Sequence, residues 1–360
     1  MKVLHLAAGN RWTGAAAPAF AEVEALRAAG VDAHYAYVGG YKLQAKLAHH
    51  DFAHPLIEKA QHPLAFVRSV QALNRMIDRH GFDVIHAHLT YDHWLARFVA
   101  RDRRIRIART FHSRRVLRTD VFTRSLINRT ELLFVINDDF RNAPAFGNRI
   151  AVFTPPPIDH RQFHADGPNA RALHGIAPDE TLVTVIGKLS KGRGFEEALQ
   201  TFAVLRQRVA CRLMIIGHGE HRPALEELSR SLGIADQVIW AGYHEDDLAE
   251  HYRASNVLLF TARGSDEGHR AVLEAMACGV PPAAYPIEGM RALTANVASE
   301  ATPESLATLV ESVIGSIAED SSRFGYSASA TRLIETYGAP DNRQPATDNR
   351  PANRQPPTAN

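Results

Sequence analysis

The sequence predicts an α/β protein built from two doubly wound parallel sheets. Three observations support this class. Apolar strand patterns alternate with helical patterns over residues 1–135 and again over 181–285. A proline-rich connector at 154–157 separates the two series. The length of 360 residues exceeds that of an ordinary single domain, so we expect two domains that face each other across a cleft.

The proline connector sets the expected domain boundary. We assign residues 1–153 to the first domain and 154–338 to the second. From residue 339 to the end at 360 the chain has no apolar residue larger than alanine or proline. Such a segment cannot bury enough apolar surface to offset its loss of conformational entropy on ordering, so we expect a disordered tail.

The first domain begins with a predicted βαβ unit. A strand at 1–8, a loop at 9–14, a helix at 15–29 and a strand at 31–38 follow one another. Backbone amides at the start of that helix would suit an anion, although the loop lacks the three glycines of a dinucleotide fingerprint. Further helices are expected at 42–50, 63–80 and 92–101, and further strands at 83–88, 105–111 and 132–137.

Three histidines follow or end the central strands of this domain. His86 and His88 belong to the strand at 83–88, and His112 comes directly after the strand at 105–111. The carboxyl ends of parallel strands meet at one edge of a sheet, where ligands bind in folds of this class. We therefore expect the three imidazoles to lie near each other.

The second domain repeats the alternation. Strands are expected at 181–186, 213–216, 238–241, 257–261 and 283–285, with helices from 195, at 271–278, at 303–318 and at 328–337. Ser265 and Asp266 are good N-caps for the helix at 271–278, and Gly279 is a good stop signal.

One carboxylate, Glu274, interrupts the apolar pattern of that helix. A poorly hydrated carboxylate is costly unless it accepts hydrogen bonds, and the two hydroxyls of a ribose would suit it. The alternative is that Glu274 lies on the outer face of an amphipathic helix.

Composition is that of an ordinary globular protein. The opening run MKVLHLAAG is too short for a signal peptide, and no stretch reaches membrane-spanning length. Cys211 and Cys278 lie far apart in apolar contexts, which favours a reducing, cytoplasmic compartment.

Charge is distributed unevenly along the chain. Residues 1–155 carry 22 Lys and Arg against 13 Asp and Glu, and the remainder carries 19 against 26. Eight arginines fall within 101–118. They indicate either attraction to an anionic membrane or a phosphorylated acceptor, or a solvated rim around a buried strand. Nucleic acid is disfavoured because the segment has no interleaved aromatic residues.

Four segments of the second domain stand in a characteristic order. They are VIGKLSKGRGFEEAL, LMIIGHGE, VIWAGYHEDDLAEHYRASNVLLFTA and GSDEGHRAVLEAMACGVP. With them, residues 1 to about 338 resemble the GT-B fold retaining glycosyltransferases of family 4. The resemblance implies a nucleotide-sugar donor and a glycan or lipid-linked acceptor, and it implies neither a cofactor nor a metal ion.

The resemblance also assigns residues to the donor diphosphate. The family signature has two cations, whose positions are taken here by Lys188 and Arg193, with Lys191 as a competing candidate. Gly187, Gly217 and, in the first domain, Gly14 match glycines at which the backbone passes close to the donor.

Further resemblances concern the sugar and the nucleoside. The family has paired acids with seven residues between them; Asp266 and Glu274 have this separation, and Glu267, with only six residues before Glu274, is the alternative first acid. Glu274 would bind the ribose, while the amides from Glu267 through Gly268 and His269 to Arg270 would run along the sugar. Tyr243 would border the base, and His112 would lie beside the reacting sugar.

The expected activity is transfer of a sugar to an acceptor hydroxyl with retention at the anomeric carbon, in the assembly of a cell-surface polysaccharide or glycolipid. We expect a cytoplasmic protein that contacts the inner face of the membrane through 101–118. The alternative is a non-catalytic GT-B scaffold that binds a nucleotide sugar and acts as a partner or regulator. A dinucleotide-dependent oxidoreductase ranks last, because the three-glycine fingerprint is missing.

Overall fold

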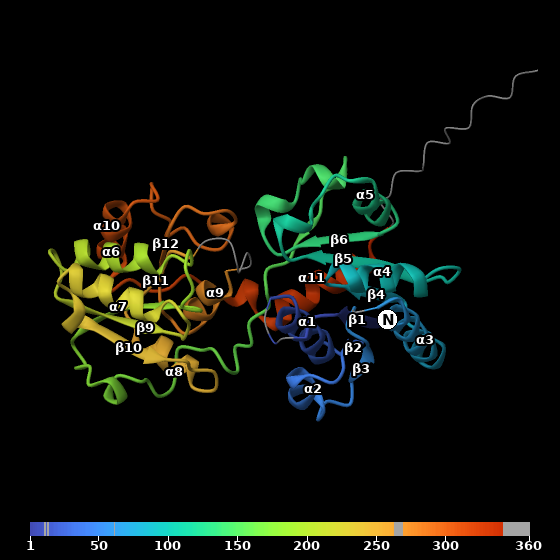
Figure 1. Cartoon of the computed structure of the whole chain (residues 1–360), viewed down its shortest axis with the longest axis horizontal. Helices are drawn as coiled ribbons and strands as arrows, with labels where there is room; N and C mark the ends of the chain where they lie inside the picture. Colours follow the sequence, from blue (N-terminus) through green and yellow to red (C-terminus); the bar gives the residue numbers. More distant parts are fainter. Residues whose placement is uncertain (11, 13, 61, 263–268, 341–360) are drawn as a thin grey trace, which may run out of the picture.

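The computed structural model describes residues 1–10, 12, 14–60, 62–262 and 269–340. They form two lobes, each built around a fully parallel sheet with helices on both faces (Figure 1). The predicted fold class is thereby confirmed. The tail from 341 onward lies outside the described residues.

The first sheet has seven strands, and its order reverses between β1 and β4. In spatial order the strands are β3 (Ala53–Ile57), β2 (Asp32–Val38), β1 (Lys2–Ala7), β4 (Val84–Ala87), β5 (Arg106–Phe111), β6 (Leu132–Val135) and β7 (Val152–Phe153). Its helices are α1 (Ala16–Ala28), α2 (Lys42–Leu47), α3 (Pro63–His80), α4 (Thr90–Val99) and α5 (Val121–Asn128). Ligands in such sheets bind outside the carboxyl ends of the strands where the order reverses.

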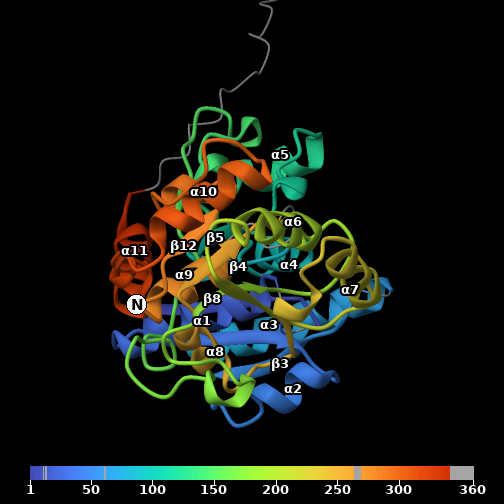
Figure 2. The ribbon, with the colours of Figure 1, turned by 90° about the vertical axis from the view of Figure 1, so that its left-hand side faces the viewer.

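The second sheet has five strands, and its order reverses between β8 and β11. In spatial order they are β10 (Val238–Gly242), β9 (Cys211–Ile216), β8 (Thr181–Ile186), β11 (Val257–Phe260) and β12 (Pro282–Ala284). Its helices are α6 (Phe195–Leu205), α7 (Arg222–Ser231), α8 (Leu248–Ala254), α9 (Arg270–Ala277) and α10 (Pro303–Val313). Apolar side chains of α6 and α10 pack on one face, and those of α8 and α9 on the other (Figure 2).

The last helix, α11 (Tyr326–Gly338), packs on the first sheet although it follows the second along the chain (Figure 1). Leu333 and Tyr337 join the apolar core formed by α1, β1 and β2. The Arg106 side chain fixes the end of this helix by donating to the carbonyl oxygens of Tyr337, at 2.6 Å, and Ala339, at 2.7 Å. The predicted assignment of residues 326–338 to the second domain was therefore wrong, because the apolar face of α11 is buried against α1.

Other element boundaries also differ from the sequence-based expectation. The strands β3 and β7 and the helices α5, α7 and α8 were not predicted. Helix α9 begins at Arg270, with His269 in the left-handed conformation at its N-cap (φ 49°); Ser265 and Asp266, the expected caps, lie outside the described residues. Both cysteines are unpaired and buried, as expected. None of the helices in the described ranges is long and apolar enough to cross a bilayer.

Candidate active site

Two loops at the carboxyl edge of the second sheet pack against each other through glycines. The amide of Gly187, just after β8, donates to the carbonyl of Ile216 at 3.0 Å, and that of Leu189 donates to His218 at 3.0 Å. A Cβ on Gly217 would lie 1.9 Å from the Gly187 carbonyl oxygen. Only glycine allows this approach. The loops therefore bring Gly187 and Gly217 together at the carboxyl ends of β8 and β9, beside the point where the strand order reverses.

We expect Gly217→Ala to destabilise the protein far more than Gly233→Ala. Both glycines have positive φ, 143° and 69°, but a Cβ on Gly233 meets nothing within 4 Å. The control should cost about 1 kcal/mol for backbone strain, and Gly217→Ala about 2–4 kcal/mol, because overpacking is added to strain. Urea unfolding of both variants measures the difference, and equal losses would contradict the close packing of these loops.

The N-terminus of α6 is held at the same edge. Gly194 precedes the helix with φ 84°, and a Cβ there would lie 2.2 Å from the Thr261 carbonyl oxygen at the end of β11. Lys188, whose side chain is 61% exposed, lies 4.0 Å from Glu220. Arg193 comes directly before Gly194 and is half-buried. The two predicted cations thus sit in the loop between β8 and α6, where the helix N-terminus also attracts anions.

Glu274 is buried in α9, with 6% of its surface exposed. The Tyr252 hydroxyl, from α8, donates to its Oε2 at 3.0 Å, and Arg270 Nε lies 2.7 Å from its Oε1. Burial, together with the nearby carboxylate, raises the pKa of Tyr252 well above its ordinary value, so the phenol stays a donor. The alternative of an outer-face carboxylate was therefore wrong, and Glu274 is a buried carboxylate that accepts a hydrogen bond from Tyr252 and forms an ion pair with Arg270.

The predicted donor-binding residues 266–269 come just before α9. Asp266, Glu267 and Gly268 lie outside the described residues, whereas His269 is described. The buried His269 ring places Nε2 at 2.7 Å from the carbonyl oxygen of Glu288. Its side chain is thus directed at the loop after β12.

That loop joins the two lobes. Arg114 pairs with the Glu288 carboxylate at 2.8 Å, and the Asn137 side-chain amide donates to the Glu288 carbonyl at 3.1 Å. The Gly289 amide donates to Asp139 at 2.7 Å. A cavity of about 500 Å³ lies against this junction and is lined by both aspartates at 138 and 139. Arg114 lies two residues after His112, so this junction adjoins that histidine in the chain.

A second junction involves Tyr243, directly after β10. Its side chain is exposed and donates to Glu245 at 2.9 Å. Glu245 also accepts from Lys46 of α2 at 2.6 Å, and the Lys46 ammonium lies 5.0 Å from the centre of the Trp12 ring. Gly14, two residues on, has φ 62° with open space where a Cβ would stand. Tyr243 is thus linked to the first-lobe loop that contains Gly14.

The three expected histidines gather as predicted, but inside the lobe rather than on an open edge. His88 Nδ1 lies 3.0 Å from His112 Nε2, while His86 and His88 are fully buried and His112 is half-buried. Burial, followed by the charge of Arg109, lowers the pKa of His112 to about 3. The chain of contacts continues to His5 on β1, whose Nδ1 lies 2.9 Å from His88 Nε2.

The arginines of 101–118 do not form one surface. One group precedes β5 and another follows it, so the groups lie at opposite ends of a six-residue strand. Arg103 is bound to Asp78 at 2.8 Å, and Arg109 is buried within the sheet. Arg106 holds the end of α11, as described above. The exposed members are Arg101, Arg104, Arg114, Arg115 and Arg118.

Sequence reasoning missed Lys46, Asp139, Glu288 and Glu22 of α1. The first three make contacts across the junction between the lobes, which no local pattern reveals. Glu22 could have been recognised from the sequence as a buried carboxylate, because it lies among apolar residues of a helix as Glu274 does.

Both parts of the chain match families of known proteins. A family model described as glycosyl transferases group 1 matches residues 166–329, and one described as glycosyltransferase family 4 matches residues 12–171. Among curated proteins, N-acetyl-alpha-D-glucosaminyl L-malate synthase of Bacillus anthracis is 26% identical over 245 residues, which are 61% of each chain. A D-inositol 3-phosphate glycosyltransferase of Rhodococcus opacus is 35% identical over 42% of this chain and 35% of its own. The matches thus span less than two thirds of these relatives.

Solved structures share the two-lobed fold. Anabaena HepE in complex with UDP superposes with a TM-score of 0.76 at 16% identity, over 93% of this chain and 99% of that one. The outer core galactosyltransferase WaaB of lipopolysaccharide does so with a TM-score of 0.65 at 16% identity, over 93% and 99%.

Two parallel sheets, one in each lobe and both with their strand order reversed at a central point, define the GT-B fold. The family matches extend this to a particular group. The chain belongs to the group 1 glycosyltransferases of family 4.

Proposed function

We propose that the protein is a retaining glycosyltransferase, which moves a sugar from a nucleoside-diphosphate sugar to an acceptor hydroxyl. The observation that carries this proposal is the loop between β8 and α6, where Lys188 and Arg193 adjoin the helix N-terminus. Negative charge builds up on the diphosphate as its bond to the sugar breaks. Fixed cations stabilise that charge most in the transition state. Anabaena HepE, of the same fold, was solved with UDP and with UDP-glucose.

In the route that we propose, the acceptor hydroxyl attacks the anomeric carbon from the face on which the diphosphate leaves. A bond forms between the acceptor oxygen and the anomeric carbon, and the bond from that carbon to the diphosphate oxygen breaks. The departing phosphate takes the acceptor proton. Glu274 would hold the ribose, and Tyr243 would border the base. This route requires no catalytic metal ion.

His112 is the first-lobe residue that we assign to the reacting sugar. Its Nδ1 atom is buried and has no hydrogen-bond partner among the described residues. A buried polar atom without a partner is costly, and a sugar hydroxyl would supply the missing hydrogen bond. Gly14 and the segment from Asp266 to Arg270 complete the proposed donor site.

The test is release of nucleoside diphosphate from a panel of UDP-, GDP- and ADP-sugars, followed by identification of the glycosylated product. We expect one donor to be turned over with retained anomeric configuration. The alternative function is a scaffold that binds a nucleotide sugar without transferring it. Its support is the departure from the family pattern: Ala15 stands where relatives often have a second glycine, Lys188 and Arg193 exchange the identities of the family's two cations, and Asp266 stands where the family usually has Glu. Tight donor binding with no release from any donor would favour the scaffold.

We further propose a glycan or lipid-linked acceptor, with contact to an anionic membrane through the exposed arginines of 101–118 that follow β5, Arg115 and Arg118. We expect co-sedimentation with vesicles containing anionic lipid at low salt, and its loss as salt rises above about 0.15 M, because exposed charges are then screened over about 8 Å. Arg115→Glu with Arg118→Glu should weaken the binding, and Arg208→Glu on the other lobe should not. Binding that is independent of salt, or none at all, would contradict the membrane contact.

A further inference from the structure

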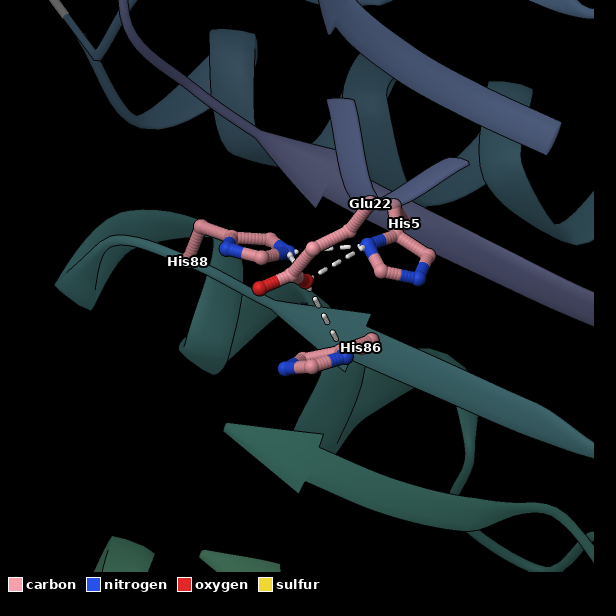
Figure 3. Close-up of side chains that lie close together, drawn as sticks. All are labelled: His5, Glu22, His86 and His88. Atoms are coloured by element: carbon pink, nitrogen blue, oxygen red, sulfur yellow. Dashed lines mark hydrogen bonds and ion pairs between the residues drawn. The ribbon is translucent and has the colours of Figure 1, made fainter. Parts of the chain in front are cut away.

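Four side chains that could ligate a metal ion meet inside the first lobe (Figure 3). They are His5 on β1, His86 on β4, His88 just beyond β4 and Glu22 on α1. His5 and His86 are directly opposite each other in the register of the two strands. All four are at most 1% exposed. The cluster lies where the strand order of the first sheet reverses, away from the proposed diphosphate site of the second lobe.

The ligand atoms have the spacing of a tetrahedral site. Glu22 Oε2 lies 3.6 Å from His5 Nδ1, 3.7 Å from His88 Nε2 and 4.0 Å from His86 Nδ1. His5 Nδ1 and His88 Nε2 are 2.9 Å apart, and all four atoms lie within 4.8 Å of one another. A tetrahedral zinc ion, with bonds of about 2.0–2.2 Å, has ligands about 3.3–3.6 Å apart. The observed separations bracket that range.

The carboxylate is also short of partners. Glu22 Oε2 is buried and has no hydrogen-bond partner among the described residues. Its distances to the three histidines are longer than hydrogen bonds. A buried carboxylate oxygen in this position is costly, and an ion at the centre of the cluster would satisfy it.

The other nitrogen of each imidazole is already held. His86 Nε2 lies 2.7 Å from the Thr110 hydroxyl, His88 Nδ1 lies 3.0 Å from His112, and His5 Nε2 lies 3.2 Å from the Tyr337 hydroxyl. Metal-binding histidines characteristically have such outer partners, which fix the ring and its tautomer. The Tyr337 hydroxyl also lies 2.6 Å from His86 Nδ1, so metal binding would leave Tyr337 with His5 alone.

We propose that His5, Glu22, His86 and His88 bind one zinc-class divalent ion. Three imidazoles and one carboxylate in tetrahedral arrangement suit zinc, and four protein ligands leave no open position for a substrate. The ion is therefore structural. It joins α1, β1 and β4, and Tyr337 connects it to α11. Through His88 it also fixes the orientation of His112, for which His88 is a positioning residue.

The test is metal analysis of the full chain. Because the site is buried, it fills during folding, so the protein is refolded with zinc, with cobalt or with a chelator and then dialysed. We expect one equivalent of zinc, a higher melting temperature than that of the chelator-treated protein, and the intense visible absorption of tetrahedral Co²⁺. Refolded protein that holds no metal would overturn the proposal in favour of a purely hydrogen-bonded cluster.

Two variants locate the ion. Glu22→Gln should abolish the Co²⁺ spectrum and retention of zinc. His174→Ala, in the cluster of half-buried His174 and His244 with buried His251, should leave both unchanged. Metal that is lost in His174→Ala and kept in Glu22→Gln would overturn the assignment; should Glu22→Gln fail to fold, the stoichiometry and spectrum of the wild type decide. If the protein holds no metal ion but still releases nucleotide from a donor, the metal site is contradicted while the proposed function stands.

Discussion

Replacing both Lys188 and Arg193 by alanine is expected to lower kcat by at least about 10³-fold. Removing a single group that stabilises developing charge typically costs about 10²–10³ in rate, and here two cations are lost together. Lys188 is largely exposed and Arg193 half-buried, and neither belongs to an apolar core. The melting temperature should therefore stay close to that of the wild type. The measurement is nucleotide release under saturating donor.

Lys191→Ala is the matched control, because Lys191 is an exposed cation in the same loop. We expect it to retain most of the activity. A large loss in Lys191→Ala, with little effect of Lys188→Ala, would mean that Lys191 takes the place assigned to Lys188 beside the diphosphate. Wild-type kcat in the double variant would contradict the assignment of this loop to the diphosphate.

The sequence predicted the fold where local signals are strong. Helix α3 has the expected bounds because Pro63 begins it and Gly81, with φ 68°, ends it. The edge strand β3 was missed because it is short, only partly buried and contains Pro55, so no alternation of apolar and polar residues marks it. The partner of α11 could not be predicted, because an apolar helical face does not specify which of two sheets it covers.

The same limit applies to the candidate site. A carboxylate in an apolar helix could be recognised locally, and this reasoning found Glu274. Its partners Tyr252 and Arg270 could not both be identified, because Tyr252 comes from the preceding helix. The histidines of β1 and β4 became a cluster only when the strand order placed His5 opposite His86. The contacts of junction residues such as Glu288 depend on how the two lobes meet. The periodicity of apolar residues along the sequence carries no information about that.

Glu274→Gln is expected to weaken donor binding by about 10- to 100-fold, because hydrogen bonds to a charged group contribute about 1.5–3 kcal/mol and the amide lacks that charge. Glutamine keeps the volume of the side chain and an oxygen that can still accept from Tyr252. The change in melting temperature should consequently be small. Titration calorimetry with the nucleoside diphosphate measures the affinity, and thermal unfolding measures the stability.

Tyr252→Phe distinguishes a ligand-binding carboxylate from one that only supports the core. This variant removes a hydrogen bond to the same carboxylate from inside the protein and touches no proposed donor contact. If Glu274 binds the ribose, Tyr252→Phe should lower the melting temperature at least as much as Glu274→Gln while weakening donor binding much less. If Glu274 serves only the packing of α9 on α8, affinity and stability should fall in the same proportion in both variants.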